Sequence, residues 1–255
     1  MKTWKKGDLE FKVSSFKTDD EAQRIAYRFV KDLMYEVASH CCLFHSTAYD
    51  FCDLPYDYKE RQLDAVLAPA IYKLCKGYIM TEIPVTRKKK DDDDQKIESS
   101  GRGDYWCIYK GYTIVIELKH SRDRYQYGVT RKDTTIDSWQ TMIKQLKDAA
   151  STYREFGEKT AGVIRLGLHF ISSCPSYDVD ENLTKDFRRD IDVINDKITR
   201  DIKDHDSNTK PDMSICWLIP EKIVNEDFMS IPGLWVFVKY FKPIRHKGAK
   251  DFIKK

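Results

Sequence analysis

One hairpin constrains the fold of this chain more than any other segment. Residues 104–119, DYWCIYKGYTIVIELK, hold two runs of aromatic and β-branched residues separated by Lys110-Gly111. Glycine tolerates positive φ, so this pair suits a two-residue turn, although a four-residue loop over 109–112 keeps the same register. Both faces of both runs are mostly apolar, which is typical of inner strands covered on both sides.

The turn predicts which charged residues of the hairpin lie together. With Tyr109 opposite Tyr112, Asp104 lies opposite Glu117, with Cβ atoms roughly 4.5–5.5 Å apart. Side chains alternate along a strand, so Lys119 shares the face of Glu117. A slip of one residue at the turn would send Asp104 to the other face.

Two carboxylates opposed on inner strands require a compensating cation. Mg²⁺ takes a few carboxylate oxygens and keeps waters and substrate oxygens as its other ligands, and Mn²⁺ can substitute for it. The backbone carbonyl of Leu118 offers a further oxygen, and Lys119 would orient or activate the attacking water. The alternative is a structural salt bridge of Lys119 with Asp104 and Glu117 near a sheet edge.

The rest of the chain alternates predicted helices and strands. Helices are expected at 19–50, 57–76, 137–156 and 178–206, and strands at 77–88, 161–172, 213–220 and 233–241. The first helix begins at Asp19 or Asp20 as N-cap, and Pro69 should kink or locally break the second. The charge run KKKDDDDQKIESSGRG (88–103) is expected to be a mobile loop.

This order of elements predicts a mixed α/β or α+β fold, formed as a single domain over residues 1–255. The chain has no run of 18 apolar residues and its start lacks the pattern of a signal peptide, so we expect no membrane partner. Seven cysteines without framework spacing favour reduced thiols in a cytoplasm. A net charge of +3 neither requires nor opposes nucleic-acid binding.

Gly103-Asp104 followed by Glu117-Leu118-Lys119 resembles the signature of the PD-(D/E)XK nuclease superfamily, with Gly103 in place of the usual proline. The order of elements also resembles the core of that superfamily: helix, three strands, helix and strand. The resemblance implies a restriction-endonuclease-like fold, with a central mixed sheet flanked by helices. The core would span about 57–172, with a helical extension at 1–56 and a further helix and strands at 173–255.

The resemblance implies Mg²⁺-dependent hydrolysis of phosphodiester bonds. Asp104, Glu117 and the Leu118 carbonyl would hold the metal, and Lys119 would act on the water. Many members carry an acidic residue on the first core helix that reaches the metal. Glu60 fits this position, and the alternative is a glutamate that only favours the helix N-terminus through the helix dipole.

Many members of the superfamily also carry a glutamine on the second core helix, often followed by an aromatic residue. Gln145, with Tyr153 two turns later, fits this position, and Gln140 is the rival. For either glutamine, the alternative is a solvated position on the flank of the helix.

The segment after the motif strand, residues 120–132, mixes basic and aromatic residues. Those that suit contacts with a nucleic-acid backbone and bases are Arg122, Arg124, Tyr125, Arg131 and Lys132. The alternative is a polar connection to the next helix.

The expected function is therefore that of a metal-dependent endonuclease or exonuclease acting on DNA, in restriction, phage defence or repair. A homo-oligomer is compatible with this function. No Walker A sequence is present, so no nucleotide cofactor is expected. The alternative is a catalytically inactive module of nuclease fold that binds nucleic acid or a protein partner.

Overall fold

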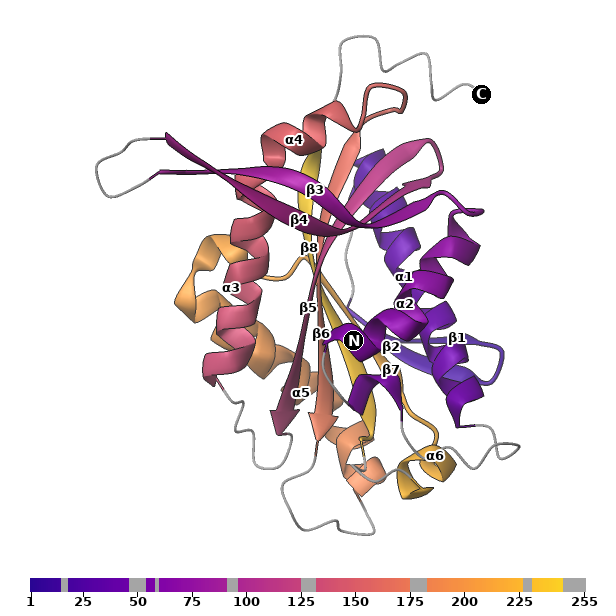
Figure 1. The fold of residues 1–255 in the computed structure, drawn as a ribbon. Helices are drawn as coiled ribbons and strands as arrows, with labels where there is room; N and C mark the ends of the chain where they lie inside the picture. The colour runs from indigo at the N-terminus through magenta and orange to yellow at the C-terminus, as the bar shows by residue number, and fades with distance from the viewer. Residues whose placement is uncertain are drawn as a thin grey trace.

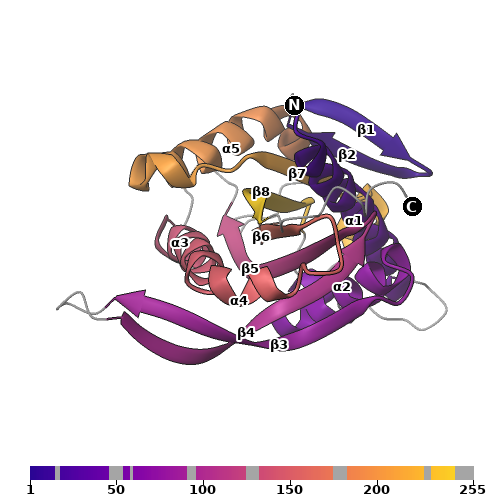
Figure 2. The ribbon, with the colours of Figure 1, turned by 90° about the horizontal axis from the view of Figure 1, so that it is seen from above.

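The protein is built around one eight-stranded mixed sheet with helices on both faces (Figures 1 and 2). A computed structural model describes residues 1–14, 18–45, 54–57, 60–90, 96–124, 132–174, 183–226 and 231–244. The strand order is β1-β2-β7-β8-β6-β5-β4-β3, and all neighbours are antiparallel except β5 and β6. The predicted mixed α+β class is confirmed.

The strands are β1 (Lys2–Lys6), β2 (Leu9–Val13), β3 (Ile79–Lys90), β4 (Lys96–Tyr109), β5 (Tyr112–Arg124), β6 (Val163–Cys174), β7 (Met213–Leu218) and β8 (Gly233–Ile244). The α-helices are α1 (Glu21–Phe44), α2 (Glu60–Leu74), α3 (Lys132–Asp148), α4 (Ala150–Glu155), α5 (Leu183–His205) and α6 (Glu221–Glu226). Two short 3₁₀ helices are η1 (Pro55–Asp57) and η3 (Ser207–Thr209).

The predicted helices form close to their expected positions. Asp20 is the N-cap of α1, and its carboxylate accepts hydrogen bonds from the amides of Ala22 and Gln23 at 2.9 and 3.4 Å. Pro69 lies inside α2 without ending it. The helix predicted at 137–156 divides into α3 and α4.

Two predictions about the chain's organisation were wrong. The N-terminal extension is not purely helical, because β1 and β2 form a hairpin that joins the sheet beside β7. The charge run at 88–103 is not one loop, because β3 extends to Lys90 and β4 begins at Lys96, with the two strands paired up to these residues. Residues 91–95 lie outside the described part of the chain.

Helices cover the sheet in two layers (Figure 2). Helices α1 and α2 pack on one face, where Phe29, Leu33 and Leu67 belong to the largest apolar cluster together with Ile116 of β5. Helices α3 and α5 pack on the other face in a second cluster, and α3 and α4 form a third. Strands β5 and β6 are therefore buried on both sides.

The central hairpin adopts the predicted register. Tyr109 pairs with Tyr112 and Tyr105 with Ile116. Lys110 and Gly111 form the two-residue turn and both have positive φ, +46° and +78°, as a type I′ turn requires.

The sheet opens where the charged motif lies. Pairing between β4 and β5 ends at Tyr105 and Ile116, while β5 keeps its pairing with β6 from Glu117 onward. Beyond this point β3 and β4 continue as a two-stranded arm, seen at the left of Figure 1. We call residues 82–90 and 96–104 the arm.

The arm begins at a distortion in β3. Glu82 has φ +53° and faces Asp104 across the hairpin, between the pairs Thr81–Tyr105 and Ile83–Gly103. Ile79 packs with the α1/α2 cluster, whereas Ile83 packs with the α3/α4 cluster. The arm is therefore turned so that its apolar face meets α4.

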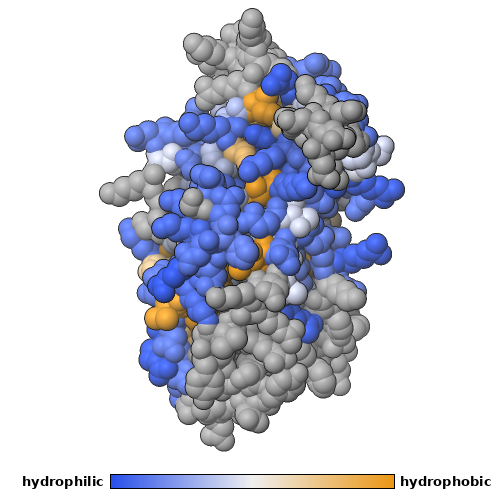
Figure 3. Space-filling view, turned by 90° about the vertical axis from the view of Figure 1, so that its left-hand side faces the viewer, coloured by the Kyte–Doolittle hydropathy of each residue, from blue (hydrophilic) through white to orange (hydrophobic). Residues whose placement is uncertain are grey.

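The outer surfaces follow the amphipathic pattern of the helices. The face that carries α3 and the arm is largely hydrophilic, with small hydrophobic spots between the polar residues (Figure 3). Within the described residues, no helix combines the length and the apolar character that crossing a membrane requires.

We expect Lys110→Asn to stabilise the protein by roughly 0.5–1 kcal/mol, because Asn adopts the left-handed backbone region more readily than Lys. The measurement is the urea midpoint of unfolding, which should rise at an unchanged m-value. Lys88→Asn is the control, since Lys88 lies in β3 and is not among the residues with positive φ. A lower midpoint for Lys110→Asn would contradict the type I′ turn.

Candidate functional site

Asp104 and Leu118 form the contact that defines the opening in the sheet. The Leu118 amide donates a hydrogen bond of 2.6 Å to Oδ2 of Asp104. The Leu118 carbonyl accepts one of 2.6 Å from Nζ of Lys119. Both backbone polar groups of Leu118 are thus satisfied by side chains, which allows β4 to leave β5 without exposing unpaired groups.

Glu117 is held by residues from two other elements. Its side chain is 1 % exposed. Oε1 accepts a hydrogen bond of 2.9 Å from the Tyr153 hydroxyl of α4 and lies 3.8 Å from the Arg87 guanidinium of β3. Both contacts are made to Oε1, and neither involves Oε2.

Lys119 pairs with the acidic residue on α2. Its Nζ lies 3.6 Å from Oε1 of Glu60, and its side chain is 18 % exposed. This ion pair replaces the alternative in which Lys119 bridges Asp104 and Glu117. Glu60 thus lies beside the motif lysine, and its contact with a metal stays a prediction.

The oxygen atoms left outside these contacts suit a hard cation. They are Oδ1 of Asp104 and Oε2 of Glu117, to which the carbonyl oxygen of Leu118 can add a second lone pair beside its bond to Lys119. Within the described residues, no three His, Cys, Asp or Glu side chains gather closely enough to hold a metal by themselves. A cation here would therefore need the carbonyl and waters as well as the two carboxylates.

The electrostatics of the site indicate a deficit of positive charge. Burial and then the neighbouring Asp104 raise the pKa of Glu117 to about 8, against the lowering effects of Tyr153, Arg87 and Lys119. Burial also raises the pKa of Asp104, against the hydrogen bond from Leu118. Burial raises the pKa of Glu60 as well. The cationic side chains present do not fully compensate the carboxylates, and a divalent cation would.

Gly103, which stands where the motif that this hairpin resembles carries a proline, has a steric reason. A Cβ at this position would lie 2.8 Å from the Tyr153 hydroxyl and 3.1 Å from Cγ1 of Ile83. The same hydroxyl donates to Glu117. A residue with a Cβ at position 103 would push Tyr153 away from Glu117.

The two candidate glutamines lie in different surroundings. With its amide oriented to satisfy its neighbours, the Gln145 oxygen accepts hydrogen bonds from both terminal nitrogens of Arg87, at 3.2 and 3.3 Å. Gln140 instead donates to the Thr209 hydroxyl at 3.0 Å, in η3. Gln145 is therefore the glutamine connected to the motif.

Sequence reasoning missed Arg87. A signal for it exists, because Arg87 follows Ile83 and Val85 at the two-residue spacing of a strand face, and both of these are buried. A basic residue that continues a buried strand face needs a partner. Here its partners are Glu117 and Gln145.

The predicted basic and aromatic segment is described only in part. Arg122 lies half-buried near the end of β5, and Arg124 and Lys132 end β5 and begin α3. Nothing is described of the side chains of Arg124 and Lys132, and Tyr125 and Arg131 lie outside the described residues. Their contact with nucleic acid stays a prediction.

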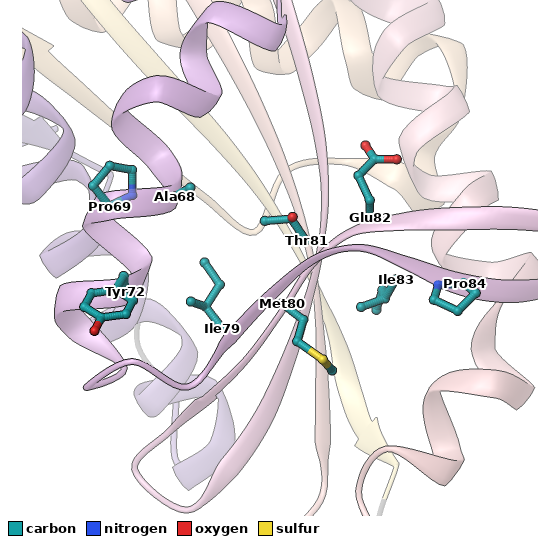
Figure 4. A pocket seen from close by; sticks show the side chains of 9 residues that line it. All are labelled: Ala68, Pro69, Tyr72, Ile79, Met80, Thr81, Glu82, Ile83 and Pro84. Atoms are coloured by element: carbon teal, nitrogen blue, oxygen red, sulfur yellow. The ribbon is translucent and has the colours of Figure 1, made fainter.

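A groove of about 750 Å³ runs along β3 on the side of α2 (Figure 4). Tyr72 and Met80 line it and are 61 % and 50 % exposed. Glu82, the residue across the hairpin from Asp104, also lines it. The groove thus lies beside the opening in the sheet.

No protein-family model, no curated protein and no solved structure matches this chain significantly. The geometry and chemistry of its own residues therefore carry the functional argument.

The raised pKa of Glu117 predicts a stability that depends on pH. Because its folded-state pKa of about 8 exceeds the ordinary 4.5, the folded protein binds this proton more tightly than the unfolded chain. Wild-type stability should therefore fall as the pH rises from about 4.5 to about 8. Glu117→Gln lacks this contribution. In EDTA the Tm of the variant minus that of the wild type should therefore increase as the pH rises across this range.

Thermal unfolding followed by circular dichroism measures the difference. At pH 8, added Mn²⁺ should raise the Tm of the wild type and leave that of Glu117→Gln unchanged, because an ion that binds the folded state stabilises it. Glu98→Gln is the matched control, since the Glu98 side chain is 60 % exposed and pairs with Lys88 on the arm. Equal pH dependence of wild type and Glu117→Gln would contradict the electrostatic description.

Proposed function

We propose that this protein is a metal-dependent nuclease of the PD-(D/E)XK type that hydrolyses phosphodiester bonds in DNA. The observation that carries the proposal is the opening between β4 and β5, where Asp104, Glu117, Lys119 and the Leu118 carbonyl lie together. Burying two carboxylates in a sheet is unfavourable, and the arrangement is understandable when a cation completes it.

The order of the elements supports the proposed restriction-endonuclease-like core. Helix α2 is followed by the antiparallel strands β3, β4 and β5, then by α3 and α4, and then by β6, which runs parallel to β5. The proposed metal ligands lie on the two inner strands of this unit, and Lys119 follows two residues after Glu117.

Asp104, Glu117 and the Leu118 carbonyl would hold Mg²⁺ or Mn²⁺, because all three offer oxygen atoms. The ion, when bound, would stabilise negative charge on the phosphate and make a water more nucleophilic. Glu117 is kept in one orientation by Tyr153, which donates to Oε1. Asp104 is kept in one orientation by the Leu118 amide.

Lys119 is the residue proposed to act on the water and the phosphate. Its ammonium group has three donors, of which one binds the Leu118 carbonyl and one points to Glu60. The third donor can orient the attacking water or bind a phosphate oxygen, whose charge increases as water attacks phosphorus. The reaction joins the water oxygen to phosphorus and breaks the bond to one sugar oxygen.

Glu60 would serve this step by holding the lysine. Its carboxylate lies 3.6 Å from Nζ of Lys119 and is 39 % exposed. A lysine side chain is long and flexible, so an ion pair at its end restricts where the ammonium group lies. Glu60 is proposed here as a positioning residue, and direct contact with a metal stays a secondary prediction.

We expect Asp104→Asn, Glu117→Ala and Lys119→Ala each to lower the rate of plasmid nicking in Mg²⁺ by roughly 10²-fold or more, because each removes a group that stabilises the transition state. Glu60→Gln should cause a smaller loss. Nicking of supercoiled plasmid with Mg²⁺ or Mn²⁺, and with EDTA as the blank, measures these rates.

Matched controls for this assay are Lys5→Ala and Glu98→Ala, a lysine and a glutamate whose side chains are 69 % and 60 % exposed outside the site. Both should nick at the wild-type rate. Robust cleavage by Glu117→Ala and Lys119→Ala would refute the site assignment. Tight binding of DNA by the wild type without any cleavage would favour the inactive binding module.

A further inference from the structure

The Arg87 side chain reaches the site through space that a glycine of the arm leaves free. Arg87 lies on β3, yet its side chain is only 18 % exposed and extends across β4. A Cβ at Gly101 of β4 would lie 2.7 Å from Nε and 3.0 Å from Cζ of Arg87. The absence of a side chain at position 101 is therefore what lets the Arg87 side chain lie against β4.

The guanidinium is fixed at its far end by three partners. One terminal nitrogen donates to the Arg102 carbonyl at 2.8 Å and lies 3.8 Å from Oε1 of Glu117. Both terminal nitrogens reach the Gln145 oxygen. The planar fork of arginine thus connects β4, β5 and α3, a geometry that the point charge of lysine cannot reproduce.

The contacts of Arg87 and Tyr153 converge on one oxygen of Glu117. Both approach Oε1, which leaves Oε2 as the oxygen that neither of them contacts. A carboxylate fixed in this way binds a cation through a single oxygen in a defined direction. Partners that orient a metal ligand typically contribute 10- to 100-fold in metal affinity.

We propose that Arg87, placed by Gly101 and Gln145, is a positioning residue that orients Glu117 so that Oε2 binds the divalent cation. The inference rests on the proposed nuclease function and adds a residue outside the Asp-Glu-Lys motif. Arg87 contacts neither the substrate nor the reacting atoms in this role. Its effect is on metal affinity rather than on the chemical step itself.

The test is Mn²⁺ binding to the full chain, measured by isothermal titration calorimetry with the metal alone. Arg87→Lys keeps the charge and loses the fork, so we expect its affinity for Mn²⁺ to fall by about 10-fold or more. Its Tm in EDTA is measured beside the affinity, to show that the variant is folded at the temperature of the titration. Arg102→Lys is the matched control, because that side chain is 72 % exposed and pairs with Glu82, and its affinity should not change.

Gly101→Ala provides a second variant that leaves Arg87 in the sequence. The atoms that its Cβ would meet belong to the flexible Arg87 side chain, so the arginine should move and the backbone should stay. We expect the same loss of Mn²⁺ affinity as in Arg87→Lys, and little further loss when the two changes are combined. High Mg²⁺ should restore nicking in both variants, since only metal affinity is reduced.

Two outcomes would overturn the inference in distinguishable ways. If the wild type binds Mn²⁺ and cleaves, and the folded Arg87→Lys and Gly101→Ala variants bind Mn²⁺ equally well, Arg87 merely ties the arm to α3. If the wild type neither binds Mn²⁺ nor cleaves, the proposed function fails and the inference fails with it.

Discussion

The hydrogen bond between the Leu118 amide and the Asp104 carboxylate is the interaction on which the site depends. The Asp104 carboxylate takes the place of a β4 carbonyl as the acceptor for the Leu118 amide, at the point where the pairing of β4 with β5 ends. The strand can therefore diverge without leaving a buried donor unsatisfied. The divergence leaves the Leu118 carbonyl facing the opening, where Lys119 reaches it, and it frees the arm to turn toward α4.

The charges at this opening follow a consistent pattern. Glu117 and Asp104 are placed where burial disfavours ionisation, and Arg87 and Lys119 reduce this cost without removing it. Such an arrangement lowers the stability of the metal-free protein and increases the gain on binding a cation. These unfavourable electrostatics are what the proposed ion would relieve.

Much of this site could be predicted from the sequence because local rules determine it. The turn at Lys110-Gly111 gives the register of the hairpin up to the pair Tyr105–Ile116. Asp104 and Glu117 come one residue later, where the strands diverge, and remain close enough for the charge of Asp104 to raise the pKa of Glu117. The positive φ of Glu82 could not be predicted, since glutamate rarely adopts that region. Strict alternation would place Ile83 and Arg87 on the same face as Ile79, toward α1 and α2, and the distortion at Glu82 turns them to α3 and α4 instead. The role of Arg87 could not be predicted because the face on which it lies depends on the distortion at Glu82. The strands at 88–90 and 96–103 could not be predicted because a two-stranded arm that leaves the sheet has no alternation of apolar and polar residues to mark it.

Gly101 and Gly103 connect these observations, because each makes room for a side chain that binds Glu117. Gly101 leaves the space through which Arg87 passes, and Gly103 leaves the space beneath the Tyr153 hydroxyl. Both φ values lie outside the left-handed region, so the missing side chain, rather than backbone freedom, explains the glycines. A proline at position 103 would fill the space that Tyr153 needs. Glycine at position 103 is thus coupled to Tyr153 on α4, and the two positions should be changed together in any variant that places a proline before Asp104.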